Sequence, residues 1–269
     1  MIDNKTIYQV DAFANKPFSG NPAGVMIVDE SVSTDWMQKM AMEMCLSETA
    51  YLIPKGEHFT IRYFTPTTEV PLCGHATLAS AHVLYELGIK GKEDKITFES
   101  LAGLLTIDKD NDWIRMSLPT YSIEKVDCPK EFSKVIGFEP IETYKSSYNW
   151  IVAIAESEED IIESEPDFEG MKKVGLGQVI ITSKSRMEGI DFAHRCFAPS
   201  AGINEDPATG SACCALAPVW FQKTNQKEFS FLQRSKRTAE LKAKLVENRV
   251  EVSGKALTIF KAELKVKPS

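Results

Sequence analysis

The chain has 269 residues, of which 43% are hydrophobic, and its net charge is −7 at neutral pH. This length suits one large domain or two of about 130 residues, and it allows a core that needs no disulfide or metal. The acidic balance argues against a nucleic-acid-binding protein, because such proteins need a concentrated basic face. The sequence has no apolar run of 18 residues, so no membrane-spanning helix is predicted. The polar N-terminus argues against a secretory signal.

The cysteine and histidine spacings predict neither a cofactor nor a bound metal. The six cysteines form no C-x-x-C pair, which argues against a zinc ribbon or a thioredoxin-type motif. The four histidines show no H-E-x-x-H spacing, and the chain has neither a G-x-G-x-x-G turn after a strand nor a P-loop. Because free cysteines are mostly buried, we expect core thiols in a reduced, cytoplasmic protein.

The predicted elements are mostly short strands, with few helices. In chain order, segments rich in β-branched and aromatic residues predict strands at 6–13, 23–28, 50–53, 59–64, 96–98, 104–107, 151–155, 179–182 and 257–260. Residues 33–45 predict an amphipathic helix capped by Ser33. Because strands and helices do not alternate regularly, the pattern favours the α+β class over a parallel doubly wound sheet. Residues 118–128 are the best candidate for a domain junction.

Two stretches, 62–82 and 195–215, share an ordered pattern. Each begins with R-x-F-x-P and continues into a loop, of seven residues in the first copy and ten in the second. Each loop ends at a glycine, Gly74 or Gly210, which is followed by one polar residue and an alanine-rich run. The copies are 133 positions apart, about half the chain, which indicates two homologous domains rather than a solenoid of short repeats.

The two alanine-rich runs predict helices that are buried on every side. Apolar residues cover most faces of the run at 76–87, which ends near Gly88, and the run at 212–221 is almost wholly apolar. We expect Pro218 to kink the second helix or end it early. Each helix start offers free N–H groups and a positive dipole end, so two starts facing one cleft would suit a small substrate that carries a carboxylate.

Four side chains near these features are candidates for chemistry, and each also has an ordinary structural interpretation. Glu48, beside an apolar strand, is either a general acid or base or a solvated carboxylate at the start of a strand. His75, which follows Gly74, is either a site residue or a histidine satisfied at a helix cap. Asp206 precedes a proline, where turn residues are common, and Ser211 starts a helix, where caps are common.

At these residues the sequence resembles the PhzF-like family of phenazine-biosynthesis isomerases, in the diaminopimelate epimerase-like superfamily. The resemblance rests on QVDAF, PFSGNPAGV, SETAYL, FTPTTEVPLCGHATLASAHVL and GINEDPATGSA, which occur in this order between residues 9 and 214. It implies two similar domains, 1–118 and 119–269, each a mixed β-sheet rolled into a barrel around a central helix. It also implies that the last strand returns to the first domain, and it favours a homodimer.

The same resemblance implies cofactor-independent proton transfer on a small carboxylate bound in the cleft between the domains. Glu48 would be the main acid/base, while His75 and Asp206 would assist in binding or in relaying the proton. The residues that would line the site and donate N–H or hydroxyl groups to the substrate are Gly74, Gly210 and Ser211.

The position of one proline limits the reaction. Related epimerases and proline racemases use two thiols, one from each domain, on opposite faces of the substrate. Cys73 stands where the first thiol would be, but Pro207 stands where the second would be, and proline carries no transferable proton. A single carboxylate therefore favours a double-bond shift or tautomerisation, and Cys73 is interpreted as a packing residue. The alternatives left open are an amino-acid epimerase or racemase and a non-catalytic protein that binds a small ligand.

Overall fold

The computed structural model describes residues 4–269, which form two compact units. Unit 1 combines the chain up to Ser117 with Ser253–Ser269, and unit 2 is Leu118–Val252. Strands outnumber helices in both units, which confirms the expected α+β class. Among the helices of the described chain, none combines the length and the apolar composition needed to cross a membrane.

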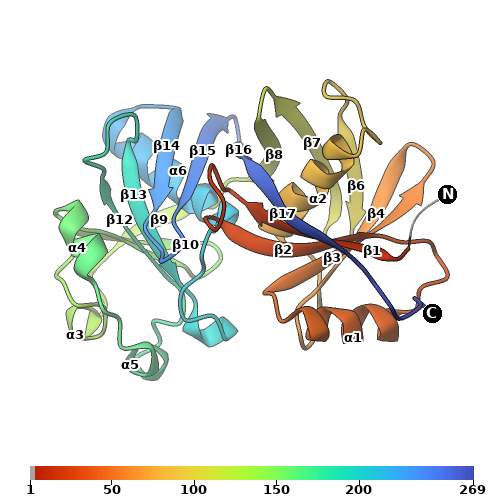
Figure 1. Cartoon of the computed structure of the whole chain (residues 1–269). Helices are drawn as coiled ribbons and strands as arrows, with labels where there is room; N and C mark the ends of the chain where they lie inside the picture. The colour runs from red at the N-terminus through yellow and green to blue at the C-terminus, as the bar shows by residue number, and fades with distance from the viewer. Residues whose placement is uncertain (1–3) are drawn as a thin grey trace. The chain divides into compact units, whose positions relative to one another are not determined.

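Unit 1 is a mixed sheet whose first and last strands lie side by side (Figure 1). The final strand of the chain, β17, pairs antiparallel with β1, which in turn pairs with β2. Strand β3 runs parallel to β2 and antiparallel to β4. The elements are β1 (Thr6–Ala12), β2 (Asn21–Ile27), α1 (Thr34–Met44), β3 (Glu48–Lys55), β4 (His58–Phe64), β5 (Glu69–Val70), α2 (Gly74–Glu86), β6 (Ile96–Ser100), β7 (Gly103–Asp110), β8 (Trp113–Pro119) and β17 (Ala256–Glu263).

Helix α2 is the central helix of unit 1. Ten of its 13 residues are buried, and it contacts β1, β2, β3 and β17. Small residues allow this close approach: a Cβ on Gly254 would lie 3.1 Å from the Leu78 side chain of α2 and 2.3 Å from the Phe13 ring. Helix α1 covers the sheet elsewhere, and Ser33 caps it by accepting a hydrogen bond from the backbone N–H of Trp36, as the sequence predicts.

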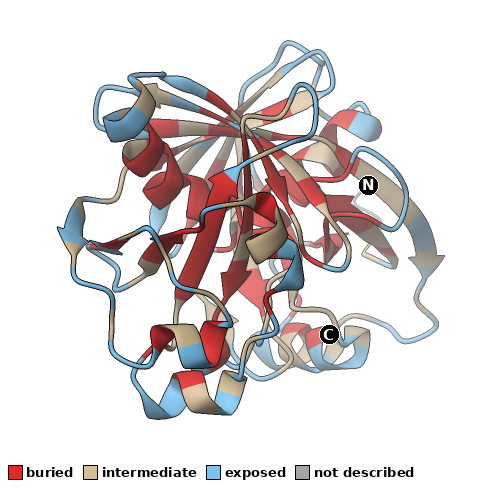
Figure 2. Cartoon of the chain, turned by 90° about the vertical axis from the view of Figure 1, so that its left-hand side faces the viewer, coloured by how far each residue is buried: buried red, intermediate tan, exposed pale blue. Residues whose placement is uncertain are grey.

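Unit 2 has its own buried strands and central helix. Figure 2 shows its strands buried between loops and helices whose outer faces are exposed. The elements are β9 (Ile123–Val126), α3 (Phe132–Ile136), β10 (Glu142–Ser146), β11 (Ile151–Ile154), α4 (Glu158–Glu163), α5 (Phe168–Lys173), β12 (Val179–Lys184), β13 (Phe192–Phe197), η1 (Pro199–Ala201), η2 (Gly210–Ala212), α6 (Cys213–Thr224), β14 (Glu228–Gln233), β15 (Ala239–Val246) and β16 (Arg249–Gly254), which runs on into unit 1.

The expectation that Pro218 ends the second helix early is wrong, because α6 runs through it to Thr224. A proline in a helix leaves the carbonyl four residues earlier without its N–H partner. That carbonyl belongs to Cys214, and it accepts a hydrogen bond from the backbone N–H of Tyr121 at 3.0 Å. An amide from outside the helix therefore replaces the bond that Pro218 cannot make.

The R-x-F-x-P repeat has the same three-dimensional arrangement in both units. Arg62 pairs with Glu69 through two hydrogen bonds of 2.7 Å, and its guanidinium carbon lies 5.1 Å from the centre of the Phe64 ring. In unit 2, Arg195 pairs with Glu205 through bonds of 2.7 and 3.1 Å and lies 5.0 Å from the Phe197 ring. The two halves thus share an ion pair over an aromatic ring as well as a sequence pattern.

The two arginines are expected to differ in their contribution to stability. Arg195 also donates to the backbone carbonyls of Ile161 and Ser164, whereas the further donation of Arg62 goes to the exposed hydroxyl of Thr34. Arg195→Met therefore leaves Glu205 and two backbone carbonyls without their donor. We expect Arg195→Met to lower the free energy of unfolding by about 3 kcal/mol and the matched Arg62→Met by about 1 kcal/mol, measured by urea unfolding. Equal losses would contradict this account of Arg195.

Candidate active site

Glu48 is the first residue of β3, directly after a tight connection from α1. The helix ends at Cys45, which adopts a left-handed conformation with φ of 53°. Only Leu46 and Ser47 separate that cap from the strand, where Glu48 pairs with Ala23 of β2. The short connection fixes the backbone of Glu48, and its side chain is 14% exposed. The carboxylate is therefore largely buried rather than solvated.

His75, the second residue of α2, faces this carboxylate. Its Nε2 lies 3.3 Å from Oε2 of Glu48, and its Nδ1 lies 3.4 Å from Sγ of Cys73. Both contacts are satisfied when the neutral imidazole donates its Nε2 proton to Glu48 and accepts the thiol proton of Cys73 at Nδ1. The ring is thus held between an acceptor and a donor, with only 9% of its side chain exposed.

The start of α2 is anchored by neighbouring hydroxyl groups. The hydroxyl of Thr77 donates to the backbone carbonyl of Cys73 at 2.7 Å and lies 2.5 Å from Oη of Tyr63. Burial raises the pKa of Tyr63 well above its usual value, so the phenol stays protonated. The N-cap residue of α2, Cys73, makes no side-chain cap hydrogen bond with the first turn. The start of α2 therefore suits an anion.

Two polar residues flank the Glu48–His75 pair. The Ser47 hydroxyl lies 3.4 Å from Nε2 of His75 and donates to Oδ1 of Asn21 at 3.4 Å. Both residues were missed by sequence reasoning. The signal that points to them is their place in the quoted PFSGNPAGV and SETAYL segments, where each directly precedes or begins a strand.

Asp206 lies in unit 2, on the loop between η1 and η2. Its Oδ2 accepts a hydrogen bond of 2.5 Å from the hydroxyl of Thr209, and its backbone N–H donates to the carbonyl of Cys196. The side chain of Gln233, on β14, holds both ends of this turn. Gln233 donates to the carbonyl of Asp206 at 2.7 Å and accepts from the N–H of Thr209 at 2.7 Å.

His194 joins this hydrogen-bond network through Gln233. It is fully buried on β13, and its Nε2 donates to Oε1 of Gln233 at 3.0 Å. Its Nδ1 has no hydrogen-bond partner among the described residues. Complete burial lowers the pKa of His194 to about 4, so the ring is neutral near pH 7. Sequence reasoning missed Gln233 and His194, because each lies more than 20 positions from its partner and forms no local pattern.

Gly210 and Ser211 begin the short turn η2, which leads into α6 at Cys213. Gly74, by contrast, is the first residue of α2 itself. The hydroxyl of Ser211 hydrogen-bonds the phenol of Tyr121, whose ring centre lies 4.5 Å from that of Tyr148. Burial raises the pKa of Tyr121, which keeps its phenol protonated. Tyr121 is a further polar neighbour that the sequence did not indicate.

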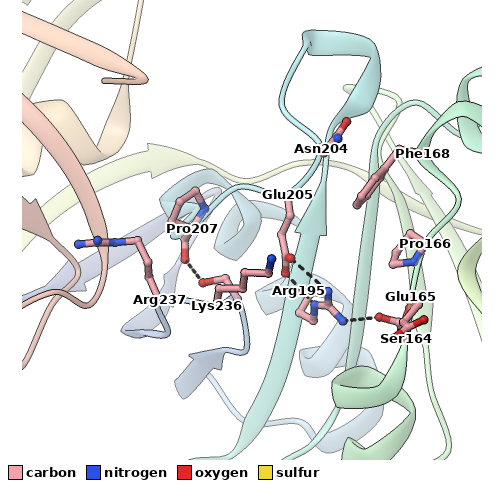
Figure 3. Close-up of a pocket in the computed structure, with 11 residues that line it drawn as sticks. Ser164, Glu165, Pro166, Phe168, Arg195, Asn204, Glu205, Pro207, Lys236 and Arg237 are labelled. Atoms are coloured by element: carbon pink, nitrogen blue, oxygen red, sulfur yellow. Dashed lines mark hydrogen bonds and ion pairs between the residues drawn. The ribbon is translucent and has the colours of Figure 1, made fainter. Parts of the chain in front are cut away.

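A pocket of about 590 Å³ opens in unit 2 beside the Asp206 loop, with Pro207 on its wall (Figure 3). Arg195 lies at its base, but Glu205 and the Ser164 carbonyl already occupy the guanidinium. The pocket therefore borders the loop that carries Asp206 without offering Arg195 to a ligand.

The structure brings three of the residues singled out by sequence together, namely Glu48, Cys73 and His75. It places Gly74 beside them as the first residue of α2. Asp206, Gly210 and Ser211 belong to unit 2, and their action on the same substrate as Glu48 stays a prediction. All six cysteines are free, and four of them, Cys73, Cys196, Cys213 and Cys214, are buried as expected.

Comparison with known proteins shows the family of this chain. The family described as phenazine biosynthesis-like protein matches residues 10–262. An uncharacterized isomerase from Halalkalibacterium halodurans is 43% identical over 96% of this chain and 97% of its own length. A crystal structure of a PhzF-family phenazine biosynthesis protein from Enterococcus faecalis has a TM-score of 0.92 at 35% identity, covering 97% of this chain and 99% of that one.

A more distant likeness concerns the fold alone. A probable proline racemase from Agrobacterium radiobacter has a TM-score of 0.62 at 13% identity, covering 98% of this chain and 94% of that one. The expected epimerase-like fold is therefore confirmed.

Burial of His194 predicts a pH-dependent stability. The native pKa of about 4 lies below the usual value of 6.5, so the unfolded chain binds this proton more tightly. Stability is therefore lost as the pH falls from about 6.5 towards 4, by about 3 kcal/mol from this residue. In urea unfolding, the free energy of unfolding of His194→Gln should fall by about 3 kcal/mol less than that of wild type between pH 7 and pH 4. A stability difference between the two proteins that is the same at both pH values does not affect this comparison. A pH dependence of stability that His194→Gln leaves unchanged would contradict the prediction.

Proposed function

This chain belongs to the phenazine biosynthesis-like family, and from that premise we propose that it is an isomerase that moves a proton on a small carboxylate without a cofactor. The expected enzyme class, an isomerase, is the class in which its relative from Halalkalibacterium halodurans is named. The observation that carries the proposed mechanism is the contact of 3.3 Å between the buried Glu48 carboxylate and His75, at the uncapped start of α2.

In the proposed reaction, Glu48 removes a proton from a carbon atom of the substrate and returns it to another. The electron pair left on the first carbon shifts into the conjugated system of the substrate, and the double bond moves. One carboxylate can serve both steps because it becomes the acid as soon as it has acted as the base. His75, hydrogen-bonded to the same carboxylate, orients it and can relay the proton.

The start of α2 is suited to the substrate's negative charge. The N–H groups of its first turn, at Gly74 and His75, receive no cap from the side chain of the N-cap residue Cys73. They would stabilise the charge that develops as the proton leaves the carbon. From unit 2, the proposal assigns Asp206 to binding or proton relay and Gly210 and Ser211 to substrate binding, as the family resemblance implies. The homodimer and the cytoplasmic location favoured by the sequence stay predictions.

Cys73 is assigned a supporting role. Inversion at a carbon by two thiols would need a second proton carrier, and Pro207 stands at its expected position. In unit 1 the Cys73 thiol lies 3.4 Å from Nδ1 of His75, whereas Glu48 contacts Nε2 of the same ring. The thiol therefore helps to hold the imidazole, and an epimerase mechanism would require a different second base.

The test is deuterium exchange in D₂O with a panel of small carboxylates, cyclic and amino-acid-like, followed by NMR. Glu48→Gln keeps the shape of the side chain but cannot shuttle a proton. We expect it to lower the exchange and turnover rates by about 10²–10⁴-fold while substrate binding survives.

Cys73→Ala serves as the matched variant and should keep most of the activity. The panel also separates the alternatives: isomerisation moves the double bond, racemisation scrambles a stereocentre, and a non-catalytic binding protein exchanges nothing. Loss of turnover in Cys73→Ala together with retention in Glu48→Gln would overturn the carboxylate mechanism.

A further inference from the structure

Glu48, Cys73 and His75 form a cluster of three different metal-ligand types. Within the described chain, one oxygen, the sulfur and one ring nitrogen of these residues all lie within 4.8 Å of one another. The spacing in sequence conceals the cluster, because Glu48 is 25 positions from Cys73 and on another element. No sequence motif therefore predicts that these three residues form a set of metal ligands.

The distances bring three donor atoms close enough to share one ion once the thiol turns. Bonds of about 2.0–2.3 Å to oxygen, nitrogen and sulfur place neighbouring ligand atoms roughly 3.3–3.6 Å apart. Here Oε2 of Glu48 lies 3.3 Å from Nε2 of His75, so oxygen and nitrogen are already at ligand spacing. Sγ of Cys73 lies 3.4 Å from Nδ1 and 3.9 Å from Nε2, so the thiol must turn towards the Glu48 side of the ring to complete the set.

The ligand types select the class of ion. A thiolate and an imidazole favour zinc and related late first-row ions, whereas magnesium and calcium prefer oxygen ligands. The carboxylate and the thiolate together balance a divalent charge. Cys73 gives up its thiol proton to solvent when the metal–sulfur bond forms.

The cluster is mostly buried, but each of its residues keeps some exposure to solvent. Cys73 is 7% exposed, and the side chains of His75 and Glu48 are 9% and 14% exposed. Three protein ligands leave the fourth tetrahedral position for water. The hydroxyl of Ser47, 3.4 Å from Nε2 of His75, lies close to the bound ion and can hydrogen-bond that water.

We infer that Glu48, Cys73 and His75 form a binding site for Zn²⁺-like ions, and that a bound ion blocks the acid/base pair. Binding itself does not depend on the proposed reaction. Its consequence does, because the ion occupies the carboxylate oxygen and the ring nitrogen that the proton would use. The site is therefore one of reversible inhibition rather than of a resident cofactor.

Co²⁺ is the spectroscopic probe, added to the full-length protein without substrate and with a non-thiol reductant. We expect the visible bands of tetrahedral Co²⁺ and an ultraviolet thiolate-to-cobalt charge-transfer band, both removed by Zn²⁺. Cys73→Ser should abolish the charge-transfer band and weaken binding at least about tenfold. The double variant Cys45→Ser, Cys128→Ser removes the two exposed thiols and should leave the spectrum unchanged.

A charge-transfer band that survives Cys73→Ser, or that disappears in the double variant, would overturn the site, as would the absence of any such band in wild type. In the exchange assay, with each protein compared with its own rate without Zn²⁺, Zn²⁺ should inhibit wild type at least about tenfold more strongly than Cys73→Ala. If exchange fails in every sample while the cobalt spectrum behaves as expected, the proposed reaction is wrong and the metal site stands.

Discussion

Helix α2 has almost no solvent-facing side, and the position of His75 follows from that constraint. A helix packed against β1, β2, β3 and β17 cannot rotate or slide without opening a cavity, since protein interiors are close-packed. Its first turn is further fixed by Thr77, which bonds back to the Cys73 carbonyl. The imidazole is consequently brought to Glu48 by the core of unit 1. Site geometry and core packing cannot vary independently here.

The two units share a structural pattern, but they differ in the polar residues that follow it. Both place an arginine over a phenylalanine and pair it with a glutamate. Yet the residue after the glycine that ends the loop is His75 in one copy, where it contacts Glu48, and Ser211 in the other. In unit 2 the equivalent loop is longer and is held by Gln233. The repeat thus explains the fold, whereas the Glu48–His75 pair belongs to unit 1.

Local sequence patterns predicted those elements in which residue propensity and the pattern of burial favour the same secondary structure. Helix α1 follows from its cap and apolar spacing, and the strands of unit 1 follow from β-branched runs. Strand β15, AELKAKLV, was missed because its alanine, leucine and lysine favour a helix, whereas its pairing with β14 holds it extended. Pro218 was misjudged for a related reason: a distant amide, that of Tyr121, compensates it. The network around Asp206 could not be found from sequence, since Gln233, which bonds Asp206, and His194, which bonds Gln233, lie on strands distant in the chain.

The surroundings of the side chains, rather than their residue types, favour Glu48 over Cys73 as the proposed proton carrier. Cys73 and His75 together look like the thiol–imidazole pair of a nucleophilic enzyme. However, the same ring reaches Glu48 through its other nitrogen, and the pair lies at the start of α2, where helix N–H groups suit an anion. A thiol that inverts a stereocentre also needs a counterpart, and the position that would supply it holds Pro207. The arrangement therefore favours chemistry by one carboxylate on one face of the substrate, with the thiol as a neighbour that holds the imidazole.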